Sequence, residues 1–190
     1  MTEITASDEQ SHWSVVGSRE IYVNPWIRLR EDHVIRPDGK PGIYGVVEFP
    51  TYALGVVPVD EFGYVYLVGQ YRYTLNAYSW EIPEGGGDKR LPMQASAERE
   101  LVEETGITAG SWVDLGPLHL SNSVTDEEGR VYLARQLNFG DARPDGDEVL
   151  RTRKVTLQTA YDMCIDGRIT DAVAIVGIIR AVEYLKRGNS

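Results

Sequence analysis

The 190-residue sequence contains a single cysteine, Cys164, so the chain cannot form an internal disulfide and fits a reducing compartment. Cys164 itself is expected to be a small buried apolar residue rather than a nucleophile. No apolar run approaches the roughly 18 residues that a membrane span needs, and the polar residues 1–10 lack the apolar core of a signal peptide. These absences predict a cytoplasmic protein that does not enter membranes.

Positive charge is also scarce, because 19 Lys and Arg residues face 29 Asp and Glu residues, which gives a formal net charge of −10. Since no Lys/Arg run is present to offset phosphates, the sequence argues against a general nucleic-acid binder. A phosphate-containing small molecule is not excluded, since metal ions can supply positive charge to an acidic site. With 42% hydrophobic residues, the chain is expected to form a packed core in one domain, or in one domain with a modest extension.

Strand-like segments rich in β-branched and aromatic residues occupy the first half of the chain. They are Ser14–Glu20, Trp26–Ile35, Ile43–Phe49, Ala53–Val59, Tyr64–Gln70 and Tyr78–Ile82. The turn signal Pro37-Asp38-Gly39 predicts that the second and third segments form a hairpin. The run Gly85-Gly86-Gly87 is predicted to break regular structure and to begin a loop that ends at Pro92.

Helix formers dominate Met93–Thr105, and Gly106 follows where a left-handed C-cap glycine is expected, so the sequence predicts a helix there. Beyond this helix, the predicted strands are Trp112–Leu120, Val131–Asn138 and Val155–Leu157, and the predicted helices are Thr159–Ile165 and Asp171–Lys186. Strands mixed with helices, without strict alternation, favour an α/β sandwich with a mixed sheet.

Three glutamates, Glu100, Glu103 and Glu104, have the i, i+3, i+4 spacing that places them on one face of the predicted helix. Their like charges repel, and a hard divalent cation such as Mg²⁺ or Mn²⁺ would offset this repulsion because it prefers carboxylate oxygens. Arg99 could neutralise one of the three. A bare pattern of this kind is more often a solvated acidic face, but the glycines before and behind the helix favour a metal site.

Gly85 and, at the expected offset, Arg99-Glu100-Leu101-Val102-Glu103-Glu104-Thr105-Gly106-Ile107 resemble the Nudix box, a loop–helix–loop signature. The resemblance implies a Nudix-like α/β/α sandwich with a mixed β-sheet, preceded by a small N-terminal antiparallel β-layer. It divides the chain into residues 1–49, a strand subdomain expected to form a homodimer, and residues 50–190, the hydrolase domain.

The same resemblance assigns roles to individual box residues. The residues expected to hold metal are Glu84 (through its carbonyl), Glu100, Glu103 and Glu104, with Glu100 and Glu104 as the principal ligands and Glu103 as a further ligand or supporting residue. Arg99 would orient the carboxylates, while Gly85 and Gly106 shape the site before and behind the helix. The implied cofactor is Mg²⁺, with Mn²⁺ as the alternative.

One box position departs from the family. Leu91 stands where the family has a glutamate that supports the loop and pairs with the box arginine. This departure implies a less rigid loop more than a loss of metal binding, and Asp88 or Glu98 could compensate for it.

The segments Gln70-Tyr71-Arg72 and Trp80–Gly85 resemble those that precede the box in ADP-ribose and nucleoside diphosphate sugar pyrophosphatases. The resemblance implies that Arg72 meets a substrate phosphate and that Glu81 accepts hydrogen bonds from the base or ribose. Without the resemblance, Arg72 is more simply read as a surface strand residue. Glu127 is expected to help hold the metal, the substrate or the nearby loop.

The general base of this subgroup is a glutamate in a mobile loop before a late strand and helix, which implies Glu148, with Asp147 as the competitor. Members with an N-terminal strand layer usually dimerise through it, and each partner contributes to the nucleotide pocket of the other. Tyr22, Trp26 and Arg28 are therefore candidates for base contact, although aromatic residues in strands are more often packing residues.

The implied reaction is metal-dependent hydrolysis of the pyrophosphate bond of ADP-ribose or a related nucleoside diphosphate sugar, which gives a nucleoside monophosphate and a sugar phosphate. Leu120–Ser123 stands in the region where the ADP-ribose subgroup has a proline, which leaves the base and the sugar open. Two alternatives remain: a Nudix pyrophosphatase for nucleoside triphosphates or dinucleoside polyphosphates, and a non-catalytic module that binds a nucleotide sugar.

Overall fold

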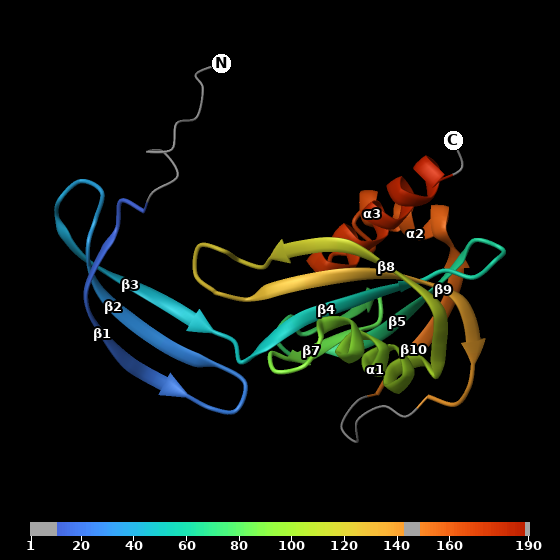
Figure 1. The fold of residues 1–190 in the computed structure, drawn as a ribbon, viewed down its shortest axis with the longest axis horizontal. Helices are drawn as coiled ribbons and strands as arrows, with labels where there is room; N and C mark the ends of the chain where they lie inside the picture. Colours follow the sequence, from blue (N-terminus) through green and yellow to red (C-terminus); the bar gives the residue numbers. More distant parts are fainter. Residues whose placement is uncertain (1–10, 143–148, 189–190) are drawn as a thin grey trace, which may run out of the picture. The chain divides into compact units, whose positions relative to one another are not determined.

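A computed structural model describes residues 11–142 and 149–188. The chain divides into two compact units (Figure 1). The first unit comprises the residues up to Pro50 together with Ser121–Asp126, and the second comprises Thr51–Leu120 together with the residues from Glu127 onward. The short segment Ser121–Asp126 therefore belongs with a part of the chain that lies far from it in sequence.

The first unit is a three-stranded antiparallel sheet with the order β1 (Ser14–Val23), β2 (Arg28–Ile35), β3 (Pro41–Glu48). The predicted hairpin between its second and third strands is confirmed, and Gly39 adopts a positive φ of 78° in the turn. Val34 is the one fully buried apolar residue of this unit among the residues described. A sheet of this size has too little apolar core of its own to be stable by hydrophobic burial alone.

Charged and polar side chains instead connect the strands of the first unit. Arg30 forms ion pairs with Asp32 and Glu48, and the Ser18 hydroxyl donates to Asp32 Oδ1 at 2.5 Å. The hydrogen bond from Ser18 lowers the pKa of the Asp32 carboxyl below its ordinary value. These contacts tie all three strands together across one face of the sheet.

The segment Ser121–Asp126 pairs with β3. Val47 N–H donates to Val124 O at 2.9 Å, and Asp126 N–H donates to Val47 O at 3.2 Å. The Asp126 carboxylate also accepts a hydrogen bond from Phe49 N–H at 2.8 Å. This pairing is tertiary and has no local signal in the sequence.

The second unit contains two sheets. A four-stranded sheet has the order β7 (Glu84–Asp88), β4 (Thr51–Pro58), β9 (Glu128–Phe139), β8 (Ile107–His119). Its β4 and β9 are parallel and its other neighbours are antiparallel, so the sheet is mixed. A three-stranded antiparallel sheet has the order β10 (Arg151–Thr156), β5 (Tyr64–Arg72), β6 (Ala77–Glu81).

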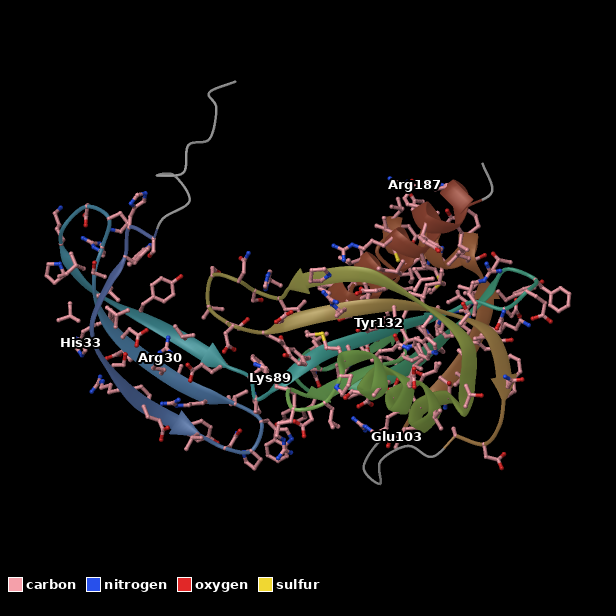
Figure 2. All side chains as sticks on the ribbon, viewed as in Figure 1. Arg30, His33, Lys89, Glu103, Tyr132 and Arg187 are labelled. Atoms are coloured by element: carbon pink, nitrogen blue, oxygen red, sulfur yellow. The ribbon has the colours of Figure 1, made fainter. Side chains whose placement is uncertain are left out.

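Helices cover both faces of the mixed sheet (Figure 1), because alternate residues of its central strands are buried on opposite sides. On one side, Leu54 of β4 and Tyr132 of β9 (labelled in Figure 2) pack with Leu101 of α1 (Met93–Thr105). On the other side, Val57 and Leu133 pack with α2 (Leu157–Ile165) and α3 (Ala172–Gly188). The predicted α/β/α sandwich with a mixed sheet is confirmed.

The helix predicted over Met93–Thr105 has those bounds, and Gly106 is its left-handed cap with a φ of 70° and an N–H that donates to Val102 O. The predicted glycine loop is wrong, because residues 84–88 form β7. β4 supplies the hydrogen-bonded partner, pairing Leu54 with Gly85, and this tertiary pairing overrides the weak strand propensity of glycine. No helix of the described residues is long and apolar enough to cross a membrane.

Candidate active site

The box helix α1 brings together three of the predicted residues. Arg99 Nη2 donates to Glu100 Oε1 at 2.6 Å, and Arg99 Nη1 donates to Glu103 Oε2 at 2.5 Å. Nη2 also donates to the carbonyl of Gly86 on β7 at 3.1 Å. Arg99 thus contacts two of the three glutamates and attaches this face of the helix to the glycine strand; Figure 2 labels Glu103 on α1.

Glu104 faces inward from the same helix and is only 4% exposed. Its Oε2 accepts a hydrogen bond from the backbone N–H of Glu84 at 3.0 Å. The last carboxylate of the box is therefore held directly against the first residue of β7.

Gly85 lies under the carboxylate of Glu100, so closely that a Cβ added to Gly85 would overlap the carboxylate carbon and both oxygens. Any other residue at this position would displace the end of the Glu100 side chain, so glycine allows the carboxylate to stay where it is. The neighbouring Gly86 differs, because a Cβ there would make ordinary van der Waals contact with Thr51. The requirement for glycine at the start of the box therefore has a local physical reason.

A second charged cluster forms around Arg72, at the end of β5. Its Nε donates to Glu81 Oε1 at 2.9 Å, and its Nη2 donates to Glu81 Oε2 at 2.6 Å and to Glu84 Oε1 at 2.8 Å. Burial alone would lower the pKa of the Arg72 guanidinium, but the hydrogen bonds and charges of Glu81 and the charge of Glu84 raise it overall. Glu81, which is 2% exposed, is thus a buried partner of the arginine.

Asp171, just before α3, completes this cluster. The carboxylate oxygens of Glu81, Glu84 and Asp171 lie within 4.8 Å of one another, the one such group of three among the residues described. Burial of the Glu84 carboxyl, followed by the nearby charges of Asp171 and Glu81, raises its pKa well above the ordinary value. Glu84 Oε2 is buried and accepts no hydrogen bond from the described residues.

Asp171 was not among the predicted site residues. The local pattern at this position, an aspartate before an apolar helix, is explained by capping, because Asp171 Oδ1 accepts from Ala174 N–H at 2.7 Å at the start of α3. Its proximity to Glu84 depends on how α3 packs against the sheet, which no local pattern reveals.

The box residues fit a hard divalent cation. Glu100 and Glu104 offer carboxylate oxygens, the ligands that Mg²⁺ and Mn²⁺ prefer, and Gly85 lets the Glu100 carboxylate lie directly against the backbone of β7. The Glu104 carboxylate is oriented by the Glu84 N–H, as metal ligands commonly are by a neighbouring hydrogen bond.

Leu91 is 54% exposed and makes no hydrogen bond through its side chain. Within the described part of the chain, neither of the residues considered as substitutes for the family glutamate forms an ion pair with Arg99: Asp88 pairs with Arg90, and Glu98 accepts from Gln94. The contacts of Arg99 with Glu100, Glu103 and the Gly86 carbonyl hold it without a glutamate at position 91.

Glu127 lies just before β9, where its carbonyl accepts from Leu120 N–H at 3.2 Å. Glu148 and its competitor Asp147 lie outside the residues that the structure describes.

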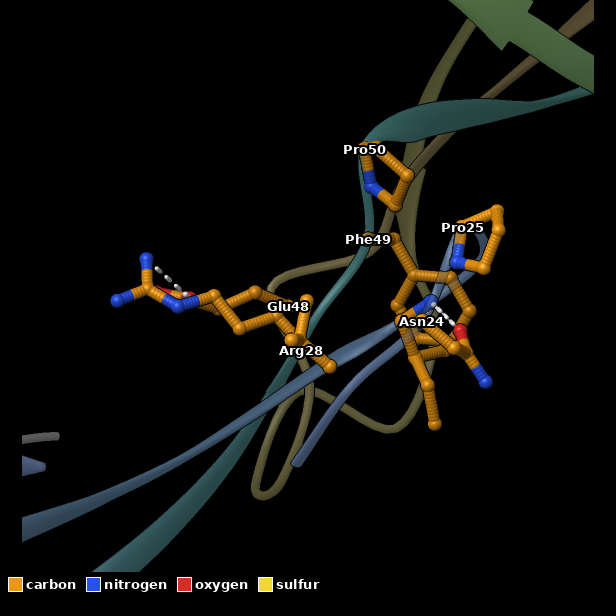
Figure 3. Close-up of a pocket in the computed structure, with 8 residues that line it drawn as sticks. Asn24, Pro25, Arg28, Glu48, Phe49 and Pro50 are labelled. Atoms are coloured by element: carbon orange, nitrogen blue, oxygen red, sulfur yellow. Dashed lines mark hydrogen bonds and ion pairs between the residues drawn. The ribbon is translucent and has the colours of Figure 1, made fainter. Parts of the chain in front are cut away.

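The first unit has a pocket of about 290 Å³. It is lined by Val23, Asn24, Pro25, Ile27, Arg28, Glu48, Phe49 and Pro50. Figure 3 shows Arg28 beside Glu48, with which it forms an ion pair at 3.3 Å. Of the three candidates for base contact, Arg28 lines this pocket, while Tyr22 and Trp26 are exposed outside it.

Comparison with known proteins agrees with this architecture. Residues 13–47 match the nucleoside diphosphate sugar hydrolase N-terminal domain, and residues 50–172 match the NUDIX domain. An ADP-ribose pyrophosphatase of Mycobacterium tuberculosis is 31% identical over 93% of this chain and 86% of its own length. An ADP-ribose pyrophosphatase of Bacillus subtilis is 30% identical over 90% of this chain and 91% of its own.

A crystal structure of an ADP compounds hydrolase superposes with a TM-score of 0.83 and 19% identity, covering 93% of this chain and 95% of that one. At this identity the superposition speaks to the fold, and it matches the mixed-sheet architecture described above. The domain match and the relatives, which align over most of this chain, show the family as well as the fold. Together with the box helix, they identify the chain as a member of the Nudix hydrolase family.

Proposed function

We propose that this protein hydrolyses the pyrophosphate bond of ADP-ribose or a related nucleoside diphosphate sugar, giving a nucleoside monophosphate and a sugar phosphate. One observation carries the proposal. Glu84 joins the box helix to the arginine cluster, because its N–H contacts Glu104 and its carboxylate contacts Arg72. Carboxylates suited to divalent cations and an arginine suited to phosphate therefore occur in one site.

Arg72 would hold the diphosphate. Its Nε and Nη2 are engaged by Glu81 and Glu84, and its Nη1 makes no hydrogen bond within the described part of the chain. The Arg72 side chain as a whole is 36% exposed. A charged, planar donor group held in one orientation is well suited to binding phosphate.

Nudix hydrolases act with divalent cations, and we assign Mg²⁺ to this chain, with Mn²⁺ as the alternative. Glu100 and Glu104 would be the principal ligands, supported by Glu103 and the carbonyl of Glu84, while Arg99 keeps the outer carboxylates oriented. When bound, the cations supply positive charge that stabilises the developing charge on the phosphoryl oxygens.

The residue that activates water is Glu148 in this proposal, with Asp147 as the competing carboxylate. Glu148→Gln is expected to lower kcat on the order of 10²-fold or more with little change in KM, because general-base catalysis contributes at about that level. Asp147→Asn is the matched control. The reverse pattern would assign the role to Asp147.

The named relatives support the choice of substrate class. Two of them are ADP-ribose pyrophosphatases, and the first unit matches a domain described for nucleoside diphosphate sugar hydrolases. The direct test is a panel of ADP-ribose, GDP-mannose, UDP-glucose, NADH, a nucleoside triphosphate and a dinucleoside polyphosphate, each with Mg²⁺ and with Mn²⁺. Preferential hydrolysis of the last two would overturn the substrate class, and calorimetric binding without hydrolysis would indicate a binding module.

We also propose that the first unit, residues 1–49, forms a homodimer interface for the hydrolase unit that follows. β1 is an edge strand whose described residues are all exposed, several of them apolar, including Val15, Val16 and Tyr22. An exposed apolar edge on a unit with little core of its own is expected to be covered by another chain. In such a dimer, Tyr22, Trp26 and Arg28 would contact the nucleotide of the partner.

Light scattering coupled to size exclusion tests the dimer. The wild type is expected to have the mass of two chains, and Val16→Lys is expected to shift the population toward monomer. Leu75→Lys, an equally apolar and exposed position in the second unit, is the control. A monomeric wild type would contradict the proposal.

A further inference from the structure

We propose that the side chain of Glu84 is a positioning residue for Arg72, distinct from the metal-binding role given to the Glu84 carbonyl. In this role the carboxylate fixes one edge of the Arg72 guanidinium so that the opposite edge meets the substrate diphosphate. The inference rests on the proposed function, since it concerns how Arg72 meets its substrate.

The hydrogen bonds of Arg72 occupy only part of its guanidinium group. A guanidinium has five N–H groups in a fixed planar fork. The Nε hydrogen and both Nη2 hydrogens are directed to Glu81 and Glu84 at distances of 2.6–2.9 Å. The two Nη1 hydrogens have no acceptor among the described residues, so the fork is held along one edge and open along the other.

The supporting residues come from different strands. Glu81 ends β6, whereas Glu84 begins β7 in the other sheet of the second unit. Glu81 alone fixes the plane of the guanidinium, but it leaves the pair free to tilt together through the side-chain torsions of both residues. A third hydrogen bond from a second sheet removes that freedom.

The Glu84 side chain is kept in a setting that disfavours a carboxylate. Its Oε2 is buried without a hydrogen-bond donor among the described residues, and the carboxylates of Glu81 and Asp171 lie close by. Burying a carboxyl group beside two other carboxylates destabilises a fold, so this arrangement is not explained by stability. Local violations of this kind are expected where a side chain serves function.

Glu84 also sets where Arg72 stands relative to the box helix. Its N–H donates to Glu104 Oε2 while its Oε1 accepts from Arg72, so one residue spans the carboxylate that serves the metal and the arginine that serves the phosphate. Any tilt of Arg72 changes the alignment of the diphosphate against Glu104, and a misplacement of this kind weakens productive binding.

Steady-state kinetics with the nucleoside diphosphate sugar that the wild type hydrolyses best provide the test. Glu84→Ala is expected to raise KM about five- to tenfold, the effect of losing one charged hydrogen bond, while kcat stays within about threefold. Glu84→Gln keeps an acceptor oxygen in the same place and is expected to restore KM to within about twofold of the wild type. A merely structural role would instead lower the active fraction, and hence kcat, at unchanged KM.

Two further variants complete the kinetic test. Asp166→Asn removes a carboxylate from an exposed ion pair with Arg168 and is expected to leave KM unchanged. In a double-mutant cycle, Arg72→Lys and Glu84→Ala are expected to be non-additive, because lysine cannot occupy the same fork. Additive effects on KM, or an unchanged KM in Glu84→Ala, would overturn the positioning role.

A measurement without substrate separates this proposal from the proposed function. In nitrogen-15 spectra of the arginine side chains, the Arg72 signals of the wild type are expected to show slowed rotation about the Cζ–Nη2 bond. This slowing is expected to be weaker in Glu84→Ala, where Glu81 still accepts from one Nη2 hydrogen, and to be kept in Glu84→Gln. If the slowing depends on Glu84 but no nucleoside diphosphate sugar is hydrolysed, the proposed function fails alone; if hydrolysis occurs and the slowing is absent, the positioning role fails.

Discussion

Arg72 and Arg99 are two arginines in one site, and they are held in different ways. The carboxylate partners of Arg99 are the next residue and the residue four positions on, both on α1, and its side chain is 48% exposed. The partners of Arg72 lie on β6 and β7, and its principal partner Glu81 is buried. The Arg99 cluster joins residues close in sequence and is exposed to solvent. The Arg72 cluster joins residues from separate strands and is largely buried.

Because of this difference, the two clusters are expected to contribute differently to the free energy of unfolding. They also differ in how far the sequence alone predicts their contacts. Exposed ion pairs contribute about 0–1 kcal/mol because water and salt screen them. Breaking a buried pair costs about 3–5 kcal/mol because it leaves an unpaired charge in the interior. Arg72 is therefore expected to matter to folding as well as to the proposed binding of phosphate, whereas Arg99 is expected to matter mainly to the orientation of two carboxylates.

The largest expected effect is on activity, and it distinguishes the buried, inner carboxylate of the box (Glu104) from the partly exposed, outer one (Glu103). Glu104→Gln removes a buried, oriented ligand and is expected to lower Mg²⁺-dependent ADP-ribose hydrolysis on the order of 10³-fold, because metal stabilisation of the transition state amounts to several kcal/mol. Glu103→Gln, at a half-exposed position paired with Arg99, is expected to cost about tenfold or less. Equal losses would remove the distinction between inner and outer ligands.

The comparison of the two arginines predicts different losses of stability. Arg72→Ala is expected to lower the free energy of unfolding by about 2 kcal/mol, less than for a fully buried pair because the Arg72 side chain is 36% exposed. Arg99→Ala is expected to lower it by under about 1 kcal/mol. Urea denaturation measures both, and a larger loss for Arg99 would reverse the ranking.

Two neighbouring glycines of β7 test whether Glu100, a partner of Arg99, needs its close contact with the strand. Gly85→Ala would drive a methyl group into the Glu100 carboxylate, so the Mg²⁺ concentration for half-maximal activity is expected to rise about tenfold or more. Gly86→Ala meets only ordinary contacts and is expected to change this concentration by less than about twofold. Similar half-maximal Mg²⁺ concentrations for the two variants would mean that the position of Glu100 does not depend on the missing side chain at Gly85.

The smallest expected effect concerns the pKa of the Cys164 thiol. Burial shifts this pKa, and no arginine of the described residues opposes the shift. Burial, followed by the charge of Asp166, raises the pKa of the Cys164 thiol to about 11. The protonated thiol is favoured in the fold, so its stability contribution is present below the ordinary thiol pKa and is lost as the pH rises toward 11. Iodoacetamide labelling is expected to be slow at pH 9 in the folded protein and fast in urea; equal rates would contradict the shift.

The parts of the site that the sequence predicted are those with local signals. The helix Met93–Thr105 and its cap at Gly106 follow from spacing within a few residues. β7 was missed because a glycine run becomes a strand only when β4 pairs with it. Asp171 was missed because packing of α3, rather than sequence proximity, brings it near Glu84.

The sheet topology followed mainly from the resemblance to the Nudix family, since short strands alone do not specify which neighbours they pair with. The roles of Arg72 and Glu81 also came from that resemblance, and their mutual pairing did not. Buried ion pairs between strands depend on register, and register is fixed by the whole hydrophobic pattern of the sheet.

The pairing of Ser121–Asp126 with β3 has a consequence for any attempt to dissect the protein. The chain crosses between its two units at residues 50/51, 120/121 and 126/127, so the boundary is not a single linker that can be cut. A fragment that begins at Thr51 would keep the loop that carries Val124 and Asp126 but lose the Val47 and Phe49 backbone that these residues bond. Shorter versions of this enzyme therefore need that loop rebuilt as well as the first fifty residues removed.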